Sequence, residues 1–450
     1  MMDGFCGYNG TMRNNAIMRG LRGWIAVCAI GMLLASCTDV NNEANAPNPL
    51  PKTTIVYLSA SSEDQGSSRI IGELAKEYGR DHPEIEYRFE GVQDVDITGK
   101  IQLLAASNDL PAMFNYQSGK PLLDMIRSGA VLNLEDTFKQ LGLYAKLNPV
   151  SVRMLKAYVN DEGLYALPLE MNIEGFWYNK KIFSRFGLKE PKTWGEMLDA
   201  AETLQKAGIQ PFAVSGKAKW PITRLINAYV IRKLGPDAME RVDRGELDLT
   251  SPGFIEAADT VQKMGLKGYF GPNVNGVGIG TSFSQFVQGK AAMFYSGSWS
   301  VRDFNNPAVN AIGAENTGFF SIPLVDGGVG TLDEYPVNAG LTTSFSKEAY
   351  NADVAAWMKY VFERYGDRAM TEMGMVTGFR VERMPAEVPP ITRMVQDRLD
   401  HLKRGALWFE ARFDARTQSL AWDNAQLLVM RASFTPEEYM RQLKASLGKE

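Results

Sequence analysis

The chain has 450 residues, of which 45% are hydrophobic and 22% charged, a composition typical of a soluble globular protein with room for two or more domains. Its 48 basic and 52 acidic residues give a net charge of −4, which argues against nucleic acid as a partner because phosphate binding requires a basic surface. The only histidines are His82 and His401, which excludes His-rich zinc sites and any mechanism that needs several histidines.

The N-terminal region has the pattern of an export signal. Arg19 and Arg22 precede the apolar stretch 24–36, which ends in small residues and is too short to span a bilayer as a stable helix. Cys37 follows directly after Ser36, and the segment behind it is polar and rich in Asn and Pro. A charged start, a short apolar core and a small-residue cleavage site are typical of secretory signal peptides.

The residues Leu34-Ala35-Ser36-Cys37 are similar to the lipobox of bacterial lipoproteins, in which the cysteine is lipidated and becomes the new N-terminus. We therefore predict that residues 1–36 are a signal peptide with an N-terminal extension. Residues 37–52 would be a lipidated cysteine and a flexible leash that tethers the folded part to the cell membrane, outside the cytoplasm. The alternative is an ordinary secretory signal with a chance cysteine. Cys6 and Cys28 would leave with the signal, so the processed chain could form no internal disulfide.

A first α/β segment follows the leash. Residues 53–58 are rich in β-branched side chains and predict a buried strand. After the polar loop 59–68, apolar residues at helical spacing in 70–78 predict a helix, and the alternation in 85–89 predicts a second strand. A further strand is expected at 110–116. Strand, helix and strand in this order predict a parallel sheet with helices packed on its faces.

A second α/β segment begins near Asn172 with a strand at 173–178. The sequence 193–196, Thr-Trp-Gly-Glu, is a capping box, and it predicts a helix that places Met197 and Leu204 inward. A later amphipathic helix is expected around 355–362, and Thr435-Pro436 predicts the start of the last helix.

Patterns for metal or nucleotide chemistry are weak in this chain. Gly276-Val277-Gly278-Ile279-Gly280 lacks the G-x-G-x-x-G spacing of a dinucleotide loop and favours a flexible loop before a helix at Thr281. Asp94, Asp96 and Asn108 do not have EF-hand spacing. We therefore expect no cofactor and no metal. A glycosidase carboxylate pair is not excluded by counting acidic residues, but no pair stands out.

Several aromatic residues lie in polar, Gly-rich surroundings, where an indole presents a flat apolar face and one N–H donor. Trp299 follows Ser296-Gly297-Ser298, and Trp220 and Trp408 lie in similar loops, while Tyr116 ends a predicted strand. A flat apolar ring suits the C–H face of a pyranose. The alternative is that each tryptophan fills a hydrophobic core.

Four stretches, in chain order, resemble extracellular solute-binding proteins of the maltose-binding-protein type, the substrate receptors of ABC importers. The closest likeness is Gly289-Lys290-Ala291-Ala292-Met293-Phe294-Tyr295-Ser296-Gly297-Ser298-Trp299. The others are Leu167-Pro168 with Gly175 to Phe183, Gly187-Leu188 with Pro191 to Glu196, and Pro336 to Leu341 ahead of Ser346-Lys347-Glu348. The likeness covers essentially the whole mature chain.

This resemblance implies an α/β fold with two lobes, a ligand cleft and a hinge between them. Lobe 1 would comprise residues 53–168 and 305–364, and lobe 2 residues 172–297 and 365–450, with crossovers at 169–171 and 298–304. The lobes would close on the ligand by hinge motion, with little between them to hold the cleft shut without it. The ligand would be an oligosaccharide or sugar derivative, delivered by a monomer to the transmembrane permease subunits.

The resemblance also implies a set of ligand contacts. Stacking would come from Trp299, Trp220, Trp408 and Tyr116, and hydroxyl contacts from Glu63, Asp64, Glu170, Asn338 and Arg380. Arg380 is also a candidate for binding a carboxylate such as that of a uronic acid. The loop 63–66 carries no aromatic residue, although many sugar binders of the family have one there.

Two other classes of function remain open. An exported polysaccharide-degrading enzyme would need a carboxylate pair or a metal site, and neither occurs at a recognisable spacing. A surface adhesion or binding protein without a transport role would usually show repeats or sandwich-like strand spacing, which are missing.

Overall fold

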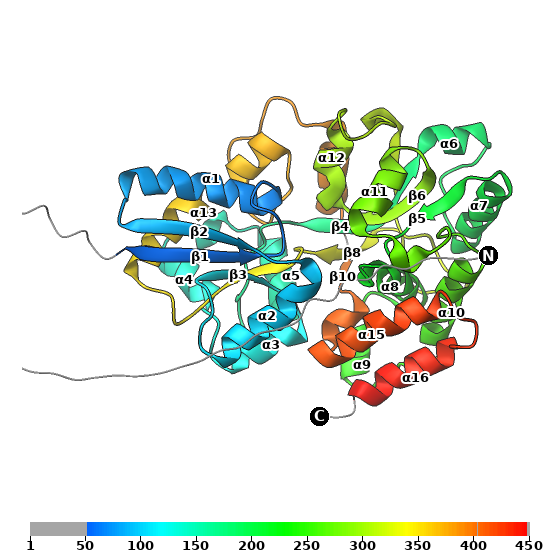
Figure 1. Ribbon diagram of the computed structural model, residues 1–450, viewed down its shortest axis with the longest axis horizontal. Coiled ribbons are helices and arrows are strands. Elements are labelled where there is room, and N and C mark those ends of the chain that lie inside the picture. The colour runs from blue at the N-terminus through cyan, green and yellow to red at the C-terminus, as the bar shows by residue number, and fades with distance from the viewer. Residues whose placement is uncertain (1–51, 403, 448–450) are drawn as a thin grey trace, which may run out of the picture. The chain divides into compact units, whose positions relative to one another are not determined.

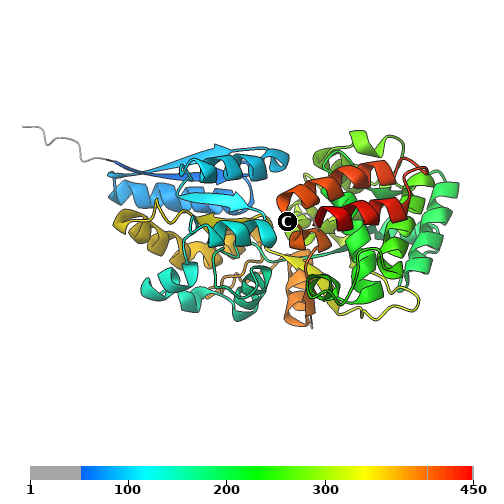
Figure 2. The same cartoon turned by 90° about the horizontal axis from the view of Figure 1, so that it is seen from below.

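The computed structural model describes residues 52–402 and 404–447, which form two α/β lobes (Figures 1 and 2). The predicted signal peptide and Cys37 lie outside the described residues. One lobe contains a four-stranded sheet and the other a six-stranded sheet. The predicted fold class, two α/β lobes, is confirmed.

Lobe 1 is built on the strand order β2-β1-β3-β9. Strands β1, β2 and β3 are parallel, and β9 is antiparallel to β3. The predicted strand, helix and strand at the start of the fold are therefore confirmed, with α1 as the connecting helix. The bounds are β1 (Thr53–Ser59), α1 (Gly66–Asp81), β2 (Ile85–Gly91), β3 (Met113–Tyr116) and β9 (Thr342–Phe345).

Helices cover both faces of this sheet. α1 packs against the long helix α13 on one side, while α2 contacts β3 on the other (Figure 1). The core of the lobe includes Tyr57, Trp357 and Tyr365, all fully buried. The remaining elements of lobe 1 are α2 (Asp94–Ala106), α3 (Lys120–Arg127), α4 (Leu134–Gln140), η1 (Tyr144–Lys146), α5 (Pro149–Tyr158) and α13 (Ala352–Met373).

Lobe 2 is built around β4, which is the strand that enters it from lobe 1. β4 pairs antiparallel with β6, β7 and β8, while β5 is parallel to β6 and β10 is parallel to β8. The bounds are β4 (Asn172–Asn179), β5 (Gln210–Ala213), β6 (Ala291–Gly297), β7 (Thr317–Phe320), β8 (Glu334–Asn338) and β10 (Arg404–Ala406).

The helices of lobe 2 include the predicted capped helix α7. Thr193 Oγ1 accepts a hydrogen bond from the Glu196 N–H, and the Glu196 carboxylate accepts one from the Thr193 N–H, which confirms the capping box. The C-terminal helices α15 and α16 pack together beside α8 and α10 (Figure 1).

The helical segments of lobe 2 are α6 (Lys180–Arg185), α7 (Trp194–Lys206), α8 (Trp220–Leu234), α9 (Ala238–Asp243), α10 (Pro252–Leu266), η2 (Val274–Gly276), α11 (Ile279–Val287), η3 (Ser298–Ser300), α12 (Val301–Asn305), η4 (Ala314–Asn316), α14 (Pro390–Asp400), η5 (Phe409–Arg412), α15 (Ala415–Leu428) and α16 (Pro436–Leu447).

The predicted lobe boundaries need correction at three places. Residues 305–338, expected in lobe 1, belong to lobe 2 because β7 and β8 both hydrogen-bond to β4. Residues 365–373, expected in lobe 2, form the end of α13, which packs on α1 in lobe 1. Residues 298–304 are not a crossover, because they form η3 and α12, and α12 packs against α14.

The chain passes between the lobes at three points. The first is the segment 168–171 before β4, which includes the expected crossover at 169–171. The second joins β8 to β9 at 339–341, and the third joins α13 to α14 at 374–389. Among the described residues, no helix is both long enough and apolar enough to cross a membrane.

Candidate functional site

A cavity of about 900 Å³ lies where the two lobes and their crossovers meet. This volume is at the upper end of the range for small-molecule sites. Residues from the ends of β1, β3 and β6 line it. The carboxyl ends of strands in open α/β sheets are the usual place for a ligand crevice. Its polar lining includes Gln65, Asp94, Asn115 and Gln117 from lobe 1, Lys219, Arg224, Arg302 and Asp423 from lobe 2, and Glu170 and Asn338 next to the crossovers.

Four tryptophans line this cavity: Trp220, Trp299, Trp408 and Trp422. Trp220 is the first residue of α8, and its ring meets that of Trp299 edge-on with centroids 6.0 Å apart. Trp299 is 37% exposed, whereas Trp408 is only 4% exposed. Trp299 therefore offers its surface to the cavity, and Trp408 forms part of its floor.

Gly297 is the reason that the Trp299 ring can lie where it does. A Cβ atom added at Gly297 would overlap the six-membered part of the Trp299 indole. The ring thus folds back over the end of β6, on a backbone position that only glycine leaves free. This contact gives the Gly-Ser-Trp sequence a structural meaning.

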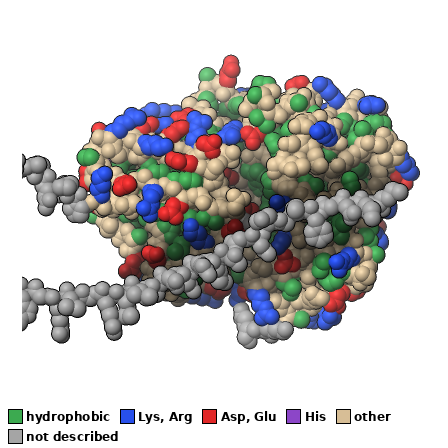
Figure 3. Space-filling view, viewed as in Figure 1, with side chains coloured by type: hydrophobic (Ala, Val, Ile, Leu, Met, Phe, Trp, Pro, Cys, Tyr) green, Lys and Arg blue, Asp and Glu red, His purple; other side chains and the backbone are tan. Residues whose placement is uncertain are grey.

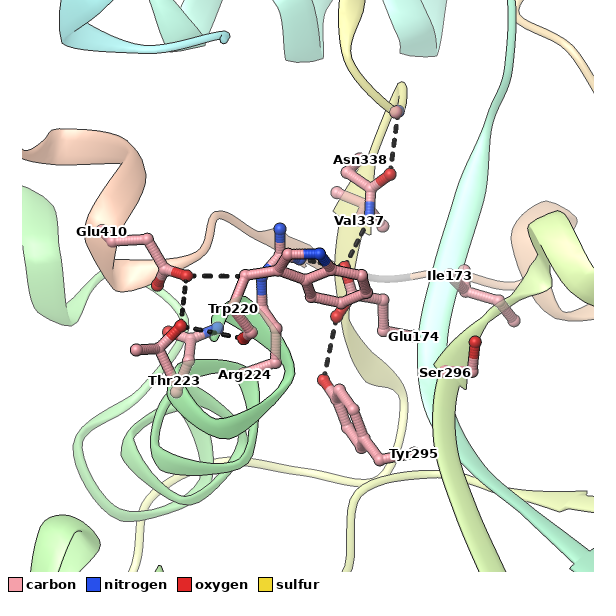
Figure 4. A network of polar contacts seen from close by, with 12 residues as sticks. Ile173, Glu174, Trp220, Thr223, Arg224, Tyr295, Ser296, Val337, Asn338 and Glu410 are labelled. Carbon is pink, nitrogen blue, oxygen red and sulfur yellow. Dashed lines mark hydrogen bonds and ion pairs between the residues drawn. The ribbon is translucent and has the colours of Figure 1, made fainter. Parts of the chain in front are cut away.

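Beneath the tryptophans lies a buried network of charged and polar groups (Figure 4). Arg224 forms an ion pair with Glu174 and lies 3.5 Å from a carboxylate oxygen of Glu410. Glu174 also accepts a hydrogen bond from Tyr295 Oη at 3.1 Å and one from the Asn338 amide. Burial raises the pKa of Glu410, while the charge of Arg224 acts in the opposite direction.

Two further carboxylates reach the cavity from the lobe 1 side. Asp94 begins α2, and loss of hydration raises its pKa, although Arg224 and a hydrogen bond from Trp220 lower it in part. Glu170 lies against Gly66 at the start of α1 and accepts a hydrogen bond from Asn172 at 3.2 Å. Burial raises the pKa of Glu170 as well.

The cationic side chains of the lining all have carboxylate partners. Lys219 is 2.5 Å from Asp423, and Arg302 is 3.2 Å from Asp303. Arg224 is paired with Glu174 and Glu410, as described above. Among the residues that line the cavity, each basic group is therefore already neutralised by the protein.

Five of the nine predicted ligand contacts line the cavity: Trp220, Trp299, Trp408, Glu170 and Asn338. Their role as ligand contacts stays a prediction. Asn338 is already engaged, because its amide N–H donates to Glu174 and its oxygen accepts from the Gly340 N–H at 2.8 Å. Its first function is thus to hold the network and the crossover that follows β8.

The structure does not place the other four in the cavity lining. Tyr116 is 1% exposed and packs inside lobe 1, where burial raises its pKa to about 12. Glu63 pairs with Lys76 at the surface, and Asp64 is exposed, while their neighbours Gln65 and Gly66 line the cavity instead.

Arg380 is exposed and lies beside lobe 1, outside the cavity lining. Its backbone N–H donates to the carbonyl of Lys146 at 2.7 Å, and its Nε donates to that of Leu147. The prediction that Arg380 contacts the ligand in the cavity is therefore wrong.

Sequence reasoning missed Arg224, Asp94 and Trp422. Arg224 follows Trp220 by four residues, so the two share a helix face, and this spacing was a signal that could have identified it. Asp94 and Trp422 reach the cavity only through the packing of distant segments, for which the sequence contains no local signal.

Within the described residues, no group of three or more His, Cys, Asp or Glu side chains is arranged to hold a metal ion.

Comparison with known proteins shows the family of the chain. Residues 61–364 match the model of the family described as bacterial extracellular solute-binding protein, which covers more than half of the chain. The chain belongs to this family. The resemblance inferred from the four sequence stretches is thereby confirmed.

Curated relatives carry similar names. The multiple sugar-binding protein of Streptococcus mutans is 25% identical over 439 residues, which is 93% of this chain and 97% of the relative. A probable sugar-binding periplasmic protein of Rhizobium meliloti is 26% identical over 189 residues, 41% of this chain and 44% of that protein.

Solved structures of similar fold include a chitin oligosaccharide binding protein, with a TM-score of 0.79, 24% identity, and coverage of 88% of this chain and 98% of that chain. The solute-binding protein RafE in complex with raffinose has a TM-score of 0.66 and 19% identity, with coverage of 88% and 98%.

Proposed function

We propose that this solute-binding protein is the receptor of an ABC importer and that it binds an uncharged oligosaccharide in the cavity between its lobes. The observation that carries the proposal is the set of tryptophans around a cavity whose polar lining is rich in hydroxyl-binding groups. Indole faces suit the apolar faces of sugar rings, and carboxylates and amides accept or donate hydrogen bonds to hydroxyls.

The charge of the lining favours a neutral ligand. Lys219, Arg224 and Arg302 are each paired with a carboxylate. Asp94 and Glu170 also line the cavity, and within the described part of the chain no cation lies at salt-bridge distance from their carboxylates. An anionic sugar would meet these two carboxylates and find its potential cationic partners already occupied. Like charges that face each other in a binding site cost several kcal/mol in affinity, on the order of a hundredfold or more.

The size of the cavity and the names of the relatives support an oligosaccharide. A volume of about 900 Å³ is larger than a single sugar ring requires, because it reaches the upper end of the range for drug-sized ligands. The multiple sugar-binding protein and the chitin oligosaccharide binding protein agree with this class by their names. Binding and release, with no bond made or broken, would be the whole activity.

The location that goes with this function is the outer side of the cell membrane. We propose that Cys37 carries a lipid anchor and that the ligand is passed to the transmembrane permease subunits of the importer, the partner that the family implies. Cys37→Ala should release stably expressed, processed protein from membranes into soluble fractions. Undiminished membrane retention of that variant would contradict the lipid anchor.

The ligand proposal is tested by calorimetry against matched pairs of sugars. We expect xylo-, chito- or raffinose-type oligosaccharides to bind and raise the melting temperature, and to be recovered intact. Oligogalacturonides of equal length should bind at least a hundredfold more weakly, because they add carboxylates to a cavity that already contains Asp94 and Glu170. Preference for the uronates would overturn the neutral-ligand proposal, and release of shortened sugars would indicate an enzyme.

A further inference from the structure

Arg224 has an unusual position for a charged residue in a ligand cavity. Only 8% of its side chain is exposed, and its guanidinium carbon lies 3.7 Å from the centroid of the Trp408 ring. The same carbon lies 5.4 Å from the centroid of the Trp220 ring. A guanidinium at these distances attracts both indoles through cation–π interaction, which reaches about 6 Å from a ring centroid.

Two carboxylates contact this guanidinium. Arg224 is paired with Glu174 and lies 3.5 Å from Glu410. Glu174 is held by Tyr295 and Asn338, and Glu410 accepts a hydrogen bond from Thr223 Oγ1 at 2.7 Å (Figure 4). Each carboxylate thus has at least one further donor. The hydrogen bond to Glu174 and the ion pair with Glu410 together restrict the guanidinium, although Arg224 Nε makes no hydrogen bond among the described residues.

Trp408, by contrast, has few polar contacts of its own. Its indole nitrogen is buried and has no hydrogen-bond partner among the described residues. The ring is therefore not held by its N–H group. The guanidinium of Arg224 lies over its face, with the guanidinium carbon 3.7 Å from the ring centroid.

We propose that Arg224 is a positioning residue of the ligand site, which holds the Trp408 and Trp220 rings in place before ligand arrives. Its charge is used within the protein, on Glu174 and Glu410, and its flat face is used on the indoles. Side chains that are already ordered lose less conformational entropy when ligand binds, and this raises affinity without a new contact. The inference rests on the proposed function, because it assumes that these rings face the ligand.

Arg224→Lys tests the proposal, since lysine keeps the positive charge near Glu174 and Glu410 but lacks the planar group. In the protein without ligand, we expect the near-ultraviolet circular dichroism of the tryptophans to change and acrylamide to quench them more strongly. In a Trp408→Phe background, most of this difference should disappear. Affinity for the neutral oligosaccharide that binds the wild type best should fall about three- to thirtyfold.

Arg232→Lys is the matched control, because Arg232 lies in the same helix and is fully buried. Its guanidinium donates to the carbonyl oxygens of Ile322 and Glu334, and it does not line the cavity. We expect this variant to lower the melting temperature and to leave the tryptophan spectra and the affinity unchanged. If Arg224→Lys behaves in this same way, Arg224 is only a structural residue and the proposal is wrong.

A milder variant covers the case in which Arg224→Lys does not fold. Thr223→Val removes the hydroxyl that donates to Glu410 and changes no residue of the cavity lining. It should shift the tryptophan spectra in the same direction by a smaller amount, and unchanged spectra would overturn the proposal.

The two proposals fail in different ways. If Arg224→Lys alters the tryptophan spectra but no oligosaccharide binds the wild type, the positioning role is retained and the sugar ligand is contradicted. If the oligosaccharide binds wild type and Arg224→Lys equally well, the sugar ligand is supported and the positioning role of Arg224 is contradicted.

Discussion

Nη1 of Arg412 in lobe 2 donates a hydrogen bond to the side-chain oxygen of Asn160 in lobe 1, over 2.9 Å. Asn160 has a φ of +52°, in the left-handed region that Asn tolerates better than most residues. The Arg412 guanidinium is also within 3.4 Å of Asp243 and 3.6 Å of Glu240, both in α9. The two lobes are thus joined by side chains as well as by crossovers, which the sequence did not predict.

We predict that Arg412→Ala shifts the protein without ligand toward an open form. Loss of this contact removes a charge-assisted hydrogen bond of about 1.5–3 kcal/mol at most, which joins the two lobes in this structure. The radius of gyration without ligand should increase in solution scattering, and ligand affinity should fall by up to about tenfold because the closed form is less populated.

Arg441→Ala is a suitable control, because Arg441 pairs with Glu438 within α16 on the surface of lobe 2. The face shown in Figure 3 carries many such charged side chains of both signs, and single surface pairs contribute little to stability. An unchanged radius of gyration in Arg412→Ala would mean that the contact does not bias the lobes.

We predict that Trp299→Ala weakens ligand binding more than it weakens the fold. Because 37% of Trp299 is exposed, its removal leaves only a small core defect, whereas loss of a stacked ring costs about 1–3 kcal/mol, or roughly ten- to a hundredfold in affinity. Calorimetry and thermal melting on the same variant separate these effects. Trp357→Phe, a change in the buried core of lobe 1, should show the opposite pattern. A large drop in melting temperature with unchanged affinity would identify Trp299 as a core residue.

We predict that Gly297→Ala reproduces part of the Trp299→Ala effect, although the indole is retained. The added methyl group would occupy the place of the Trp299 ring over the end of β6 and push the ring aside. Affinity should fall about tenfold, on the scale of a displaced rather than a deleted ring, and Trp299 fluorescence should change. Gly99→Ala is the control, because Gly99 does not line the cavity and a Cβ atom there meets nothing within 4 Å. Wild-type affinity in Gly297→Ala would show that the ring position is not critical.

Local sequence patterns predicted the parts of this structure that depend on neighbours in the chain. The capping box at Thr193 and Glu196 and the strand, helix and strand from β1 to β2 depend on residues a few positions apart. The Gly-Ser-Trp sequence pointed to Trp299 as a residue of the cavity, and its ring position depends on Gly297, two residues before it.

Patterns failed where the outcome depends on packing between distant segments. Glu174 and Arg224 are separated by 50 positions, and their pairing appears only when β4 and α8 meet. Tyr116 ends a strand, as the sequence indicated, but helices cover it, and burial rather than strand position decides that it does not line the cavity. The boundary at 305–338 was missed because strand partners, unlike strands, have no local signature.

The last prediction concerns the pH dependence of stability and the carboxyl group of Glu410. Burial raises the pKa of Glu410 in the folded protein above its usual value, because the charged form loses hydration, and the Arg224 charge and the Thr223 hydrogen bond offset this only in part. Between the unfolded and the folded pKa, the folded state binds more protons than the unfolded state. The free energy of unfolding contributed by this group therefore rises as pH falls through the folded pKa, and the rise is complete below the unfolded pKa.

Glu410→Gln removes this titration and keeps the size of the side chain. We expect the free energy of unfolding of wild type minus that of the variant to increase as pH falls from about 8 toward about 4.5, the usual glutamate range. Urea denaturation of both proteins across this range measures the difference. Carboxylates with a lowered pKa, such as Asp248 with a pKa of about 2, contribute stability to the protein that is lost in acid. Because both proteins contain them, their contributions cancel in the difference.

A constant difference for Glu410→Gln would mean that its folded pKa is close to normal, so that the pairing with Arg224 fully compensates burial. A difference that shrinks in acid would mean that the ion pair outweighs burial and lowers the folded pKa, in which case Arg224 holds Glu410 charged across the whole physiological range.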